Sequence, residues 1–272
     1  MPRCGHNGCR TWRLLLAAYR GIRFDGEWFC TGRCLADATT QRLESLRPPR
    51  IARVPTMPPV RLGATLVASR SISTETLAQA LAGQTNTGLR LGAQLVTMGV
   101  VDEGTITHAL ARQSGVGFLT KVDARTVRRT VAGLSRTVVH ALGVVPLDTE
   151  RDGTLRIAVA APLPRMAIAA LQSGTGLRVR AYLVGDSVLR ELLDAYGADV
   201  TTVPATGVGR LSAAQAARRI ADAALAGRAV TWHHTWGPGF AWVRLDGASG
   251  SEDLIVAPSR TEHTWQVALT QR

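Results

Sequence analysis

Four cysteines near one end of the chain are the side chains best suited to binding a metal ion. They form two pairs, with four residues between the members of the first pair and three between those of the second, and they are Cys4, Cys9, Cys30 and Cys34. Four thiolates complete the tetrahedral coordination of a structural Zn²⁺ site. The apolar run Leu14–Ala18 is too short for a secretory signal, so metal binding is favoured over disulfides. We therefore predict a structural zinc site at these cysteines.

Two alternatives remain open for this segment. His6 lies inside the first pair and could replace one cysteine, or the four thiols could be buried without a metal. The stretch Gly26–Cys34, followed by a helical pattern, resembles treble-clef zinc fingers, which implies a small unit held together by its metal. Such a finger binds nucleic acid or protein, and no pattern for reading a DNA groove is present.

An Arg-Leu-Gly triplet that occurs twice is the second candidate for chemistry. It opens two copies of one pattern within Arg61–Gln113, the first at Arg61 and the second 29 residues later at Arg90. A repeat at a fixed period indicates one supersecondary unit used twice. The apolar spacing of each copy predicts a pair of helices, with Ser73 and Asp102 as caps of the second helix in each pair. Four such helices pack as a small bundle.

The triplet combines groups that suit a nucleotide. At the start of a helix, a guanidinium beside a glycine places positive charge next to free backbone N–H groups, which favours a phosphate. Arginine also forms bidentate hydrogen bonds with guanine, and glycine lets a ligand approach the backbone. Core packing alone accounts for the leucines but leaves the triplets unexplained. Ligand binding and simple packing therefore both remain open on the residues alone.

The whole repeated pattern, Arg-Leu-Gly-x2-Leu-Val-x2-Gly followed by Leu-x2-Ala-Leu-Ala-x-Gln, resembles the MshEN domain. That domain is the N-terminal part of type II secretion and type IV pilus assembly ATPases, and several of its members bind cyclic di-GMP. The resemblance implies one half of this messenger per repeat, with arginine and backbone at the guanine and phosphate and leucines along the bases. The implied ligand-binding residues are Arg61, Leu62, Gly63, Leu66, Val67, Arg70, Leu77, Leu81, Arg90, Leu91, Gly92, Leu95, Val96, Gly99, Ile106 and Leu110.

The two copies differ at one position of the pattern. Arg70 stands in the first copy where Gly99 stands in the second. If glycine is needed there for a positive φ or a close approach, the first half-site is altered, whereas Arg70 could instead add a phosphate contact. The second copy is the stronger candidate for ligand binding.

Composition, with its proline-rich and small-residue stretches, divides the chain into six parts of an α+β multidomain protein. We predict a zinc finger at 1–46, a proline-rich linker at 47–59, the duplicated repeat as ligand-binding subdomain at 60–119, an α/β subdomain at 120–198, a linker at 199–211 and a C-terminal α+β module at 212–272. Proline at the density of the first linker blocks helix formation and favours stiff, extended chain.

The α/β subdomain is predicted to run helix, strand, strand, helix, strand, helix, with the third helix capped by Asp186 and the second stopped by Gly174 or Gly176. This order also resembles the second half of the same domain family, although Ala161 stands where that family commonly has Asp before Pro162. The resemblance implies that any contact made by the Asp is absent.

The C-terminal module is predicted as a helix over 213–225 followed by strands at 229–236, 240–245, 253–256 and 264–269. The neighbouring residues His233 and His234 would point to opposite faces of the first strand, so we expect sheet packing there and no shared metal.

The net charge and the absence of two motifs limit the functions that the sequence allows. The net charge of +12, carried by 31 Arg and the single Lys121, attracts anions such as nucleotides, nucleic acid or acidic proteins. The sequence has no apolar run of about 18 residues that would span a membrane and no Gly-x4-Gly-Lys-Ser/Thr loop. We therefore expect a cytoplasmic protein that is not an enzyme.

Three hypotheses follow. The leading one is a receptor or adaptor that binds cyclic di-GMP and signals to a protein partner of the secretion or pilus type. The alternatives are a scaffold that docks onto the same machinery without a ligand, and a zinc-finger protein that binds nucleic acid.

Overall fold

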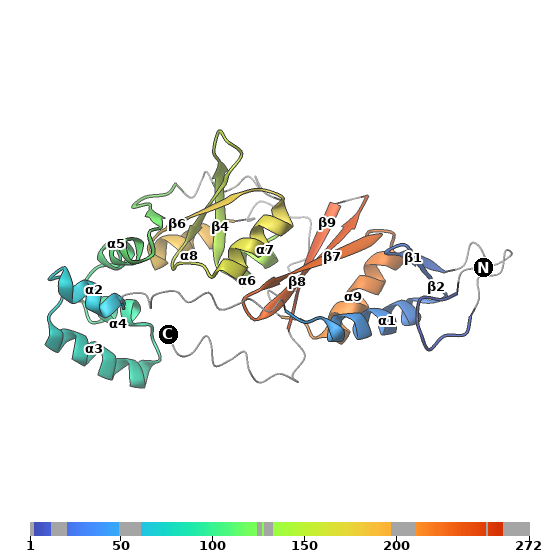
Figure 1. The fold of residues 1–272 in the computed structure, drawn as a ribbon, viewed down its shortest axis with the longest axis horizontal. Coiled ribbons are helices and arrows are strands. Elements are labelled where there is room, and N and C mark those ends of the chain that lie inside the picture. The colour runs from blue at the N-terminus through green and yellow to red at the C-terminus, as the bar shows by residue number, and fades with distance from the viewer. Residues whose placement is uncertain are drawn as a thin grey trace.

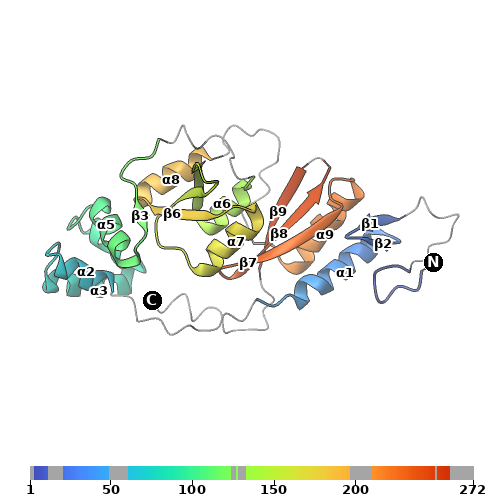
Figure 2. The same cartoon turned by 45° about the horizontal axis from the view of Figure 1, so that its top comes forward.

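The computed structural model describes residues 3–11, 21–48, 61–123, 127, 133–196, 210–248 and 250–257. Figure 1 shows an elongated arrangement, with the helical repeat at one end and the cysteine-bearing segment at the other. The α/β subdomain and the C-terminal sheet lie between them, and Figure 2 shows the same order from another angle. Most of both predicted linkers, the apolar run Leu14–Ala18 and the strand predicted at 264–269 lie outside the described residues.

Each copy of the repeat forms a pair of helices, as predicted. The first copy gives α2 (Leu62–Ala68) and α3 (Thr74–Thr87), and the second gives α4 (Leu91–Thr97) and α5 (Glu103–Ser114). The predicted caps are confirmed, because the Ser73 side chain accepts a hydrogen bond from the backbone N–H of Thr76, and Asp102 accepts one from that of Thr105. The bundle has its own apolar core, which includes Leu66, Ile72, Ala80, Leu95, Ile106 and Ala109.

The α/β subdomain follows the predicted element order. Its elements are β3 (Gly117–Phe118), α6 (Arg136–Leu142), β4 (Val144–Thr149), β5 (Leu155–Val159), α7 (Arg165–Thr175), β6 (Val179–Leu183) and α8 (Asp186–Ala195). The strands lie in the order β3-β6-β5-β4, with β5 and β6 parallel and β4 antiparallel to β5. Strand β3 was not predicted, because a strand of two residues is too short to show an apolar period.

Two helix boundaries in this subdomain refine the predictions. Gly176 ends α7 in the left-handed conformation, with φ of 70°, whereas Gly174 lies inside the helix beneath the ring of Trp242. The prediction that Asp186 caps α8 is wrong, since the N-cap residue is Gly185 and makes no side-chain cap. A carboxylate from the repeat takes the capping role at this end of α8.

The cysteine-bearing segment and the C-terminal module share one hydrophobic core. The segment forms β1 (Ile22–Phe24), β2 (Glu27–Phe29) and α1 (Gly32–Ser45), and the module forms α9 (Ala213–Leu225), β7 (Thr231–Gly237), β8 (Phe240–Gly247) and β9 (Gly250–Val256). Helices α1 and α9 pack along each other (Figures 1 and 2). Buried side chains from both ends of the sequence meet in this core, a relation that the sequence analysis did not anticipate.

Helix α9 ends at an exposed leucine. The Leu225 side chain is 60% exposed and is not among the residues of the buried face. Alanines fill most of the buried face instead, because α1 lies close against it. Among the described residues, no helix is both long and apolar enough to cross a membrane.

A buried ion pair joins the C-terminal sheet to the α/β subdomain. Arg244 on β8 donates to both carboxylate oxygens of Asp253 on β9, at 2.8 and 3.0 Å. The same guanidinium donates to the carbonyl oxygens of Gly174 and Gly133, while Asp253 accepts from the backbone N–H of Ser135 at the start of α6. The pair therefore fixes the sheet against α6 and α7.

Candidate ligand site and metal centre

The glycines of the two Arg-Leu-Gly triplets are explained by close helix packing. Gly63 and Gly92 are buried. A Cβ atom at Gly63 would lie 2.7 Å from Cδ1 of Leu77, and one at Gly92 would lie 2.8 Å from Cγ2 of Ile106. Each glycine thus lets the first helix of its repeat approach the second. Their predicted role of admitting a ligand to the backbone is not needed to account for them.

The same glycines show how the two repeats face each other. A Cβ at Gly63 would lie 3.3 Å from Cδ2 of Leu91 in the other repeat, and one at Gly92 would lie 3.7 Å from Cδ2 of Leu62. Each triplet leucine therefore reaches the glycine of the opposite triplet. This reciprocal contact relates α2 and α4 by an approximate two-fold arrangement, so equivalent residues of the copies occupy equivalent surroundings.

The triplet arginines keep their charge available. Arg61 and Arg90 are exposed, precede α2 and α4 with nearly identical φ values of −66° and −67°, and make no side-chain cap. Within the described part of the chain, neither guanidinium has an acidic partner. Because α2 and α4 are only seven residues long, the charge at these positions comes from the guanidinium groups and little from a helix dipole.

The difference between Arg70 and Gly99 leaves the backbone unchanged. Arg70 has a φ of 58° and Gly99 a φ of 69°, so both lie in the left-handed region. Their N–H groups donate to equivalent carbonyls, those of Val67 and Val96, both at 2.9 Å. The first copy therefore keeps the turn, at the cost of about 1–2 kcal/mol that this conformation imposes on a residue with a side chain. It also adds an exposed guanidinium to the first copy of the repeat.

The aliphatic candidates divide between the core and the surface. Leu66 and Leu95 are fully buried, so in this conformation they support the bundle and lie out of reach of a ligand. Leu81 is 49% exposed, while the equivalent Leu110 is half-buried and packs against the α/β core. The remaining members of the set, Leu62, Val67, Leu77, Leu91 and Val96, are partly buried, whereas Ile106 is buried.

Exposed apolar side chains gather on the repeat and on the strand that follows it. Five of the seven large apolar side chains that are exposed among the described residues lie between 81 and 118, and they are Leu81, Leu89, Met98, Val100 and Phe118. Nucleotides are contacted by arginines at their phosphates and by apolar groups at their bases, and this bundle exposes side chains of both kinds.

A contact that the sequence analysis missed anchors the second copy. Glu103 at the start of α5 accepts hydrogen bonds from the backbone N–H and the hydroxyl of Ser187, in the first turn of α8. A Cβ at Gly185 would lie 2.7 Å from this carboxylate, so the glycine makes room for it. The first copy has Thr74 at the equivalent position. In the sequence, Glu103 is marked only by this difference between the two copies.

The four cysteines converge, as predicted. The Sγ atoms of Cys4, Cys9, Cys30 and Cys34 all lie within 4.8 Å of one another, and all four are free thiols. The separations from Cys30 are 3.6 Å to Cys9 and 3.5 Å to Cys34. A tetrahedral site with Zn–S bonds of about 2.3 Å places its sulfurs about 3.8 Å apart, so the cluster fits such an ion. His6 is not part of the group.

Local structure positions these thiols. Cys30 follows β2, and the N–H of Cys34 donates to the Thr31 side chain that caps α1, so the second pair spans the start of the helix. Contact with the Thr11 hydroxyl lowers the pKa of Cys9 to about 6, which favours the thiolate that binds metal. Burial raises the pKa of Cys4, and it raises that of Cys34 to about 12.

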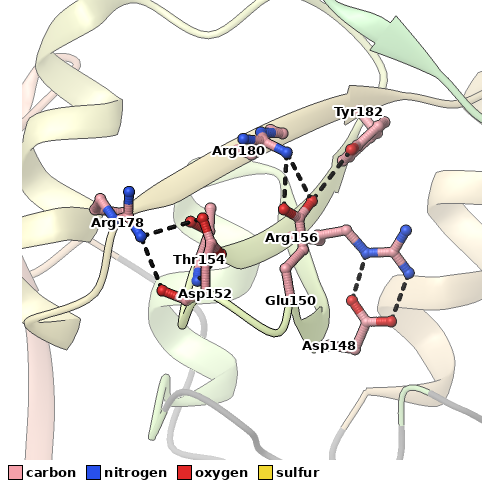
Figure 3. Close-up of polar contacts among 8 residues, drawn as sticks. All are labelled: Asp148, Glu150, Asp152, Thr154, Arg156, Arg178, Arg180 and Tyr182. Atoms are coloured by element: carbon pink, nitrogen blue, oxygen red, sulfur yellow. Dashed lines mark hydrogen bonds and ion pairs between the residues drawn. The ribbon is translucent and has the colours of Figure 1, made fainter.

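The exposed face of the α/β sheet carries arginines that are already neutralised. Figure 3 shows three ion pairs across β4, β5, β6 and the turn between β4 and β5. Arg156 pairs with Asp148, Arg178 with Asp152, and Arg180 with Glu150, which also accepts a hydrogen bond from Tyr182. The Arg156 hydrogen bonds lower the pKa of Asp148. Balanced pairs of this kind leave little charge for an anionic ligand.

Comparison with known proteins identifies one part of the chain. The family profile described as "MshEN domain" matches residues 115–202, which begins directly after the repeat. A structure of MshE with cdg is similar at 27% identity, covering 50% of this chain and 99% of that one, with a TM-score of 0.41. The N-terminal domain of XpsE is similar at 26% identity, covering 50% and 93%, with a TM-score of 0.38.

No match was found among curated proteins. The family match coincides with the α/β subdomain whose element order suggested the same resemblance, and the matched stretch contains neither the repeat nor the cysteine cluster. The chain therefore contains an MshEN domain at residues 115–202, preceded by a zinc-finger-like segment with four clustered cysteines.

Proposed function

We propose that the repeat Arg61–Gln113 binds cyclic di-GMP, with one half of the messenger on each copy, and that the protein is a receptor or adaptor without catalytic activity. The observation that carries this proposal is the reciprocal packing of the two triplets. It offers a ligand with two like halves two equivalent surfaces, each with an exposed guanidinium at the same position.

The chemistry of the two surfaces supports this ligand. Arg61 and Arg90 can form bidentate hydrogen bonds with guanine O6 and N7 or with a phosphate. Exposed and half-exposed aliphatic side chains lie on the same bundle and can contact the base faces. The two halves are unequal, because Arg70 adds a charge to the first and only the second is anchored to the MshEN domain through Glu103.

That anchor supplies a route for the signal. The second copy carries α5, whose first residue caps α8 and whose Leu110 packs on the α/β core. A ligand that shifted α4 and α5 would therefore act on the MshEN domain directly. We propose that the changed surface is recognised by a protein partner of the secretion or pilus assembly type.

We also propose that the cysteine cluster holds a structural Zn²⁺. The donor set of four thiolates is the one that zinc prefers for structural sites, and the sulfur separations suit a tetrahedral ion. The ion would tie β2 and the start of α1 to the N-terminal segment.

Calorimetry with single substitutions tests the ligand assignment. Arg61→Ala and Arg90→Ala should each weaken cyclic di-GMP binding by about 1–3 kcal/mol, roughly 5- to 150-fold in Kd, because each removes one bidentate contact. Arg112→Ala is the matched control, since Arg112 is an exposed arginine in the last turn of α5 outside the triplets. Equal affinities in all three variants would reject the assignment.

A further inference from the structure

A cavity lies where three parts of the chain meet. It has a volume of about 520 Å³ and lies between the end of α1, the first turns of α7 and the strand β7. Figures 1 and 2 both place these three elements side by side, far from the repeat. Its lining includes Arg47, Arg165, Met166, His234 and Trp236. The cavity is open to solvent, since Arg47, Arg165 and His234 are exposed, and it lies at a junction of modules, where small-molecule sites often occur.

The cavity carries positive charge that no described residue neutralises. The guanidinium of Arg165 is exposed and has no hydrogen bond or ion pair to any other described residue. The guanidinium of Arg47 donates only to the backbone carbonyls of Glu44 and Leu46, which carry no net charge. No carboxylate is among the described residues that line the cavity. The arginines on the MshEN sheet (Figure 3) each form an ion pair with an acidic residue, in contrast to the arginines of this cavity.

The remaining lining is suited to an aromatic group. Trp236 is half-buried and is held in place by the core that the cysteine-bearing segment shares with the C-terminal sheet. Met166 and Ala169 on α7 add apolar surface. Indole and thioether side chains both make favourable contacts with flat aromatic rings.

We propose that this cavity binds a phosphate-bearing aromatic ligand of mononucleotide size. Arg47 and Arg165 would hold the phosphate, because two guanidinium groups offer the forked donors that phosphate oxygens accept. Trp236 and Met166 would contact the base, and His234 would supply a further hydrogen-bonding group. The site is separate from the repeat and does not depend on what the repeat binds.

A ligand in this cavity would contact three parts of the chain at once. Arg47 follows α1 of the cysteine-bearing segment, Arg165 begins α7 of the MshEN domain, and Trp236 belongs to the C-terminal sheet. A bound nucleotide would touch all three and would stabilise their relative placement.

Binding of adenosine and guanosine monophosphate to the full chain, measured by calorimetry, tests the proposal. We expect saturable binding that is at least roughly tenfold weaker in Arg165→Ala, because a charge-assisted contact is lost, with partial recovery in Arg165→Lys. Inorganic phosphate and the matching nucleosides should bind more weakly than the nucleotides, since each lacks one half of the contacts. Arg190→Ala is the control, being an exposed arginine on α8 that does not line the cavity.

Further variants separate this site from others. Replacing both Arg61 and Arg90 by alanine should leave adenosine monophosphate binding unchanged, which distinguishes the cavity from the repeat; guanosine monophosphate is left out of this comparison, because it is one half of cyclic di-GMP and can occupy the repeat. The proposal is overturned if no saturable nucleotide binding occurs at millimolar concentration, or if Arg165→Ala binds as tightly as the unmodified chain. Binding of a single-stranded oligonucleotide without any binding of mononucleotides would also overturn it.

Discussion

Asp253→Ala should strongly destabilise the joint between the C-terminal sheet and the MshEN domain. The Asp253 side chain is 2% exposed and that of Arg244 is 11% exposed, so solvent screens their interaction very little. Asp253 also accepts hydrogen bonds from the indole N–H of Trp242, at 2.7 Å, and from the backbone of Ser135. Removing the carboxylate leaves a buried guanidinium without its counter-ion, at a cost of about 3–5 kcal/mol. That is a large part of the 5–15 kcal/mol by which domains are stable.

Urea unfolding followed by circular dichroism measures this loss. A double-mutant cycle with Arg244→Ala isolates the pair: the double variant should lose less than the sum of the two single variants, because the second substitution removes a charge that the first left unpaired. Asp148→Ala serves as the control for an exposed pair, since the Asp148 side chain is 52% exposed. A loss below about 1 kcal/mol for Asp253→Ala, or strict additivity in the cycle, would refute this account of the joint.

Three further predictions concern other parts of the fold. Arg70→Gly should raise the free energy of unfolding by about 1 kcal/mol by relieving the positive φ, and a decrease in urea titrations would contradict this. Asp148→Asn should cost about 0.5 kcal/mol at pH 7, and this cost should disappear in acid, because hydrogen bonds from Arg156 lower the pKa of Asp148 in the folded protein, so the stabilisation is present above the unfolded pKa and is lost as pH falls through the folded one. An equal loss of stability at pH 7 and in acid would contradict this prediction. Metal analysis should find about one zinc per chain and markedly less in Cys30→Ser; no zinc in the unmodified chain would exclude the site.

The sequence predicted local structure well where the signal was local. The repeat, its caps at Ser73 and Asp102, and the succession of helices and strands from Arg136 to Ala195 follow from apolar spacing and capping chemistry within short stretches. The clustering of the four cysteines was also predictable, because their side chains have few other uses in that spacing.

Features that depend on long-range packing were not predictable in this way. The packing of α1 against α9 joins segments almost two hundred residues apart, and the sequence of neither helix indicates which element it packs against. Glu103 replaces the expected cap of α8 from another subdomain, and the triplet glycines serve helix contacts between repeats. Each requires the tertiary arrangement before its reason can be seen.

Titration of the unmodified chain with cyclic di-GMP by calorimetry tests the central claim most directly. The account predicts saturable binding with micromolar or tighter affinity, and a marked loss in the Arg90→Ala variant but not in Arg112→Ala. Absence of heat at high protein concentration, together with no change in the spectrum of the protein on adding the messenger, would contradict it.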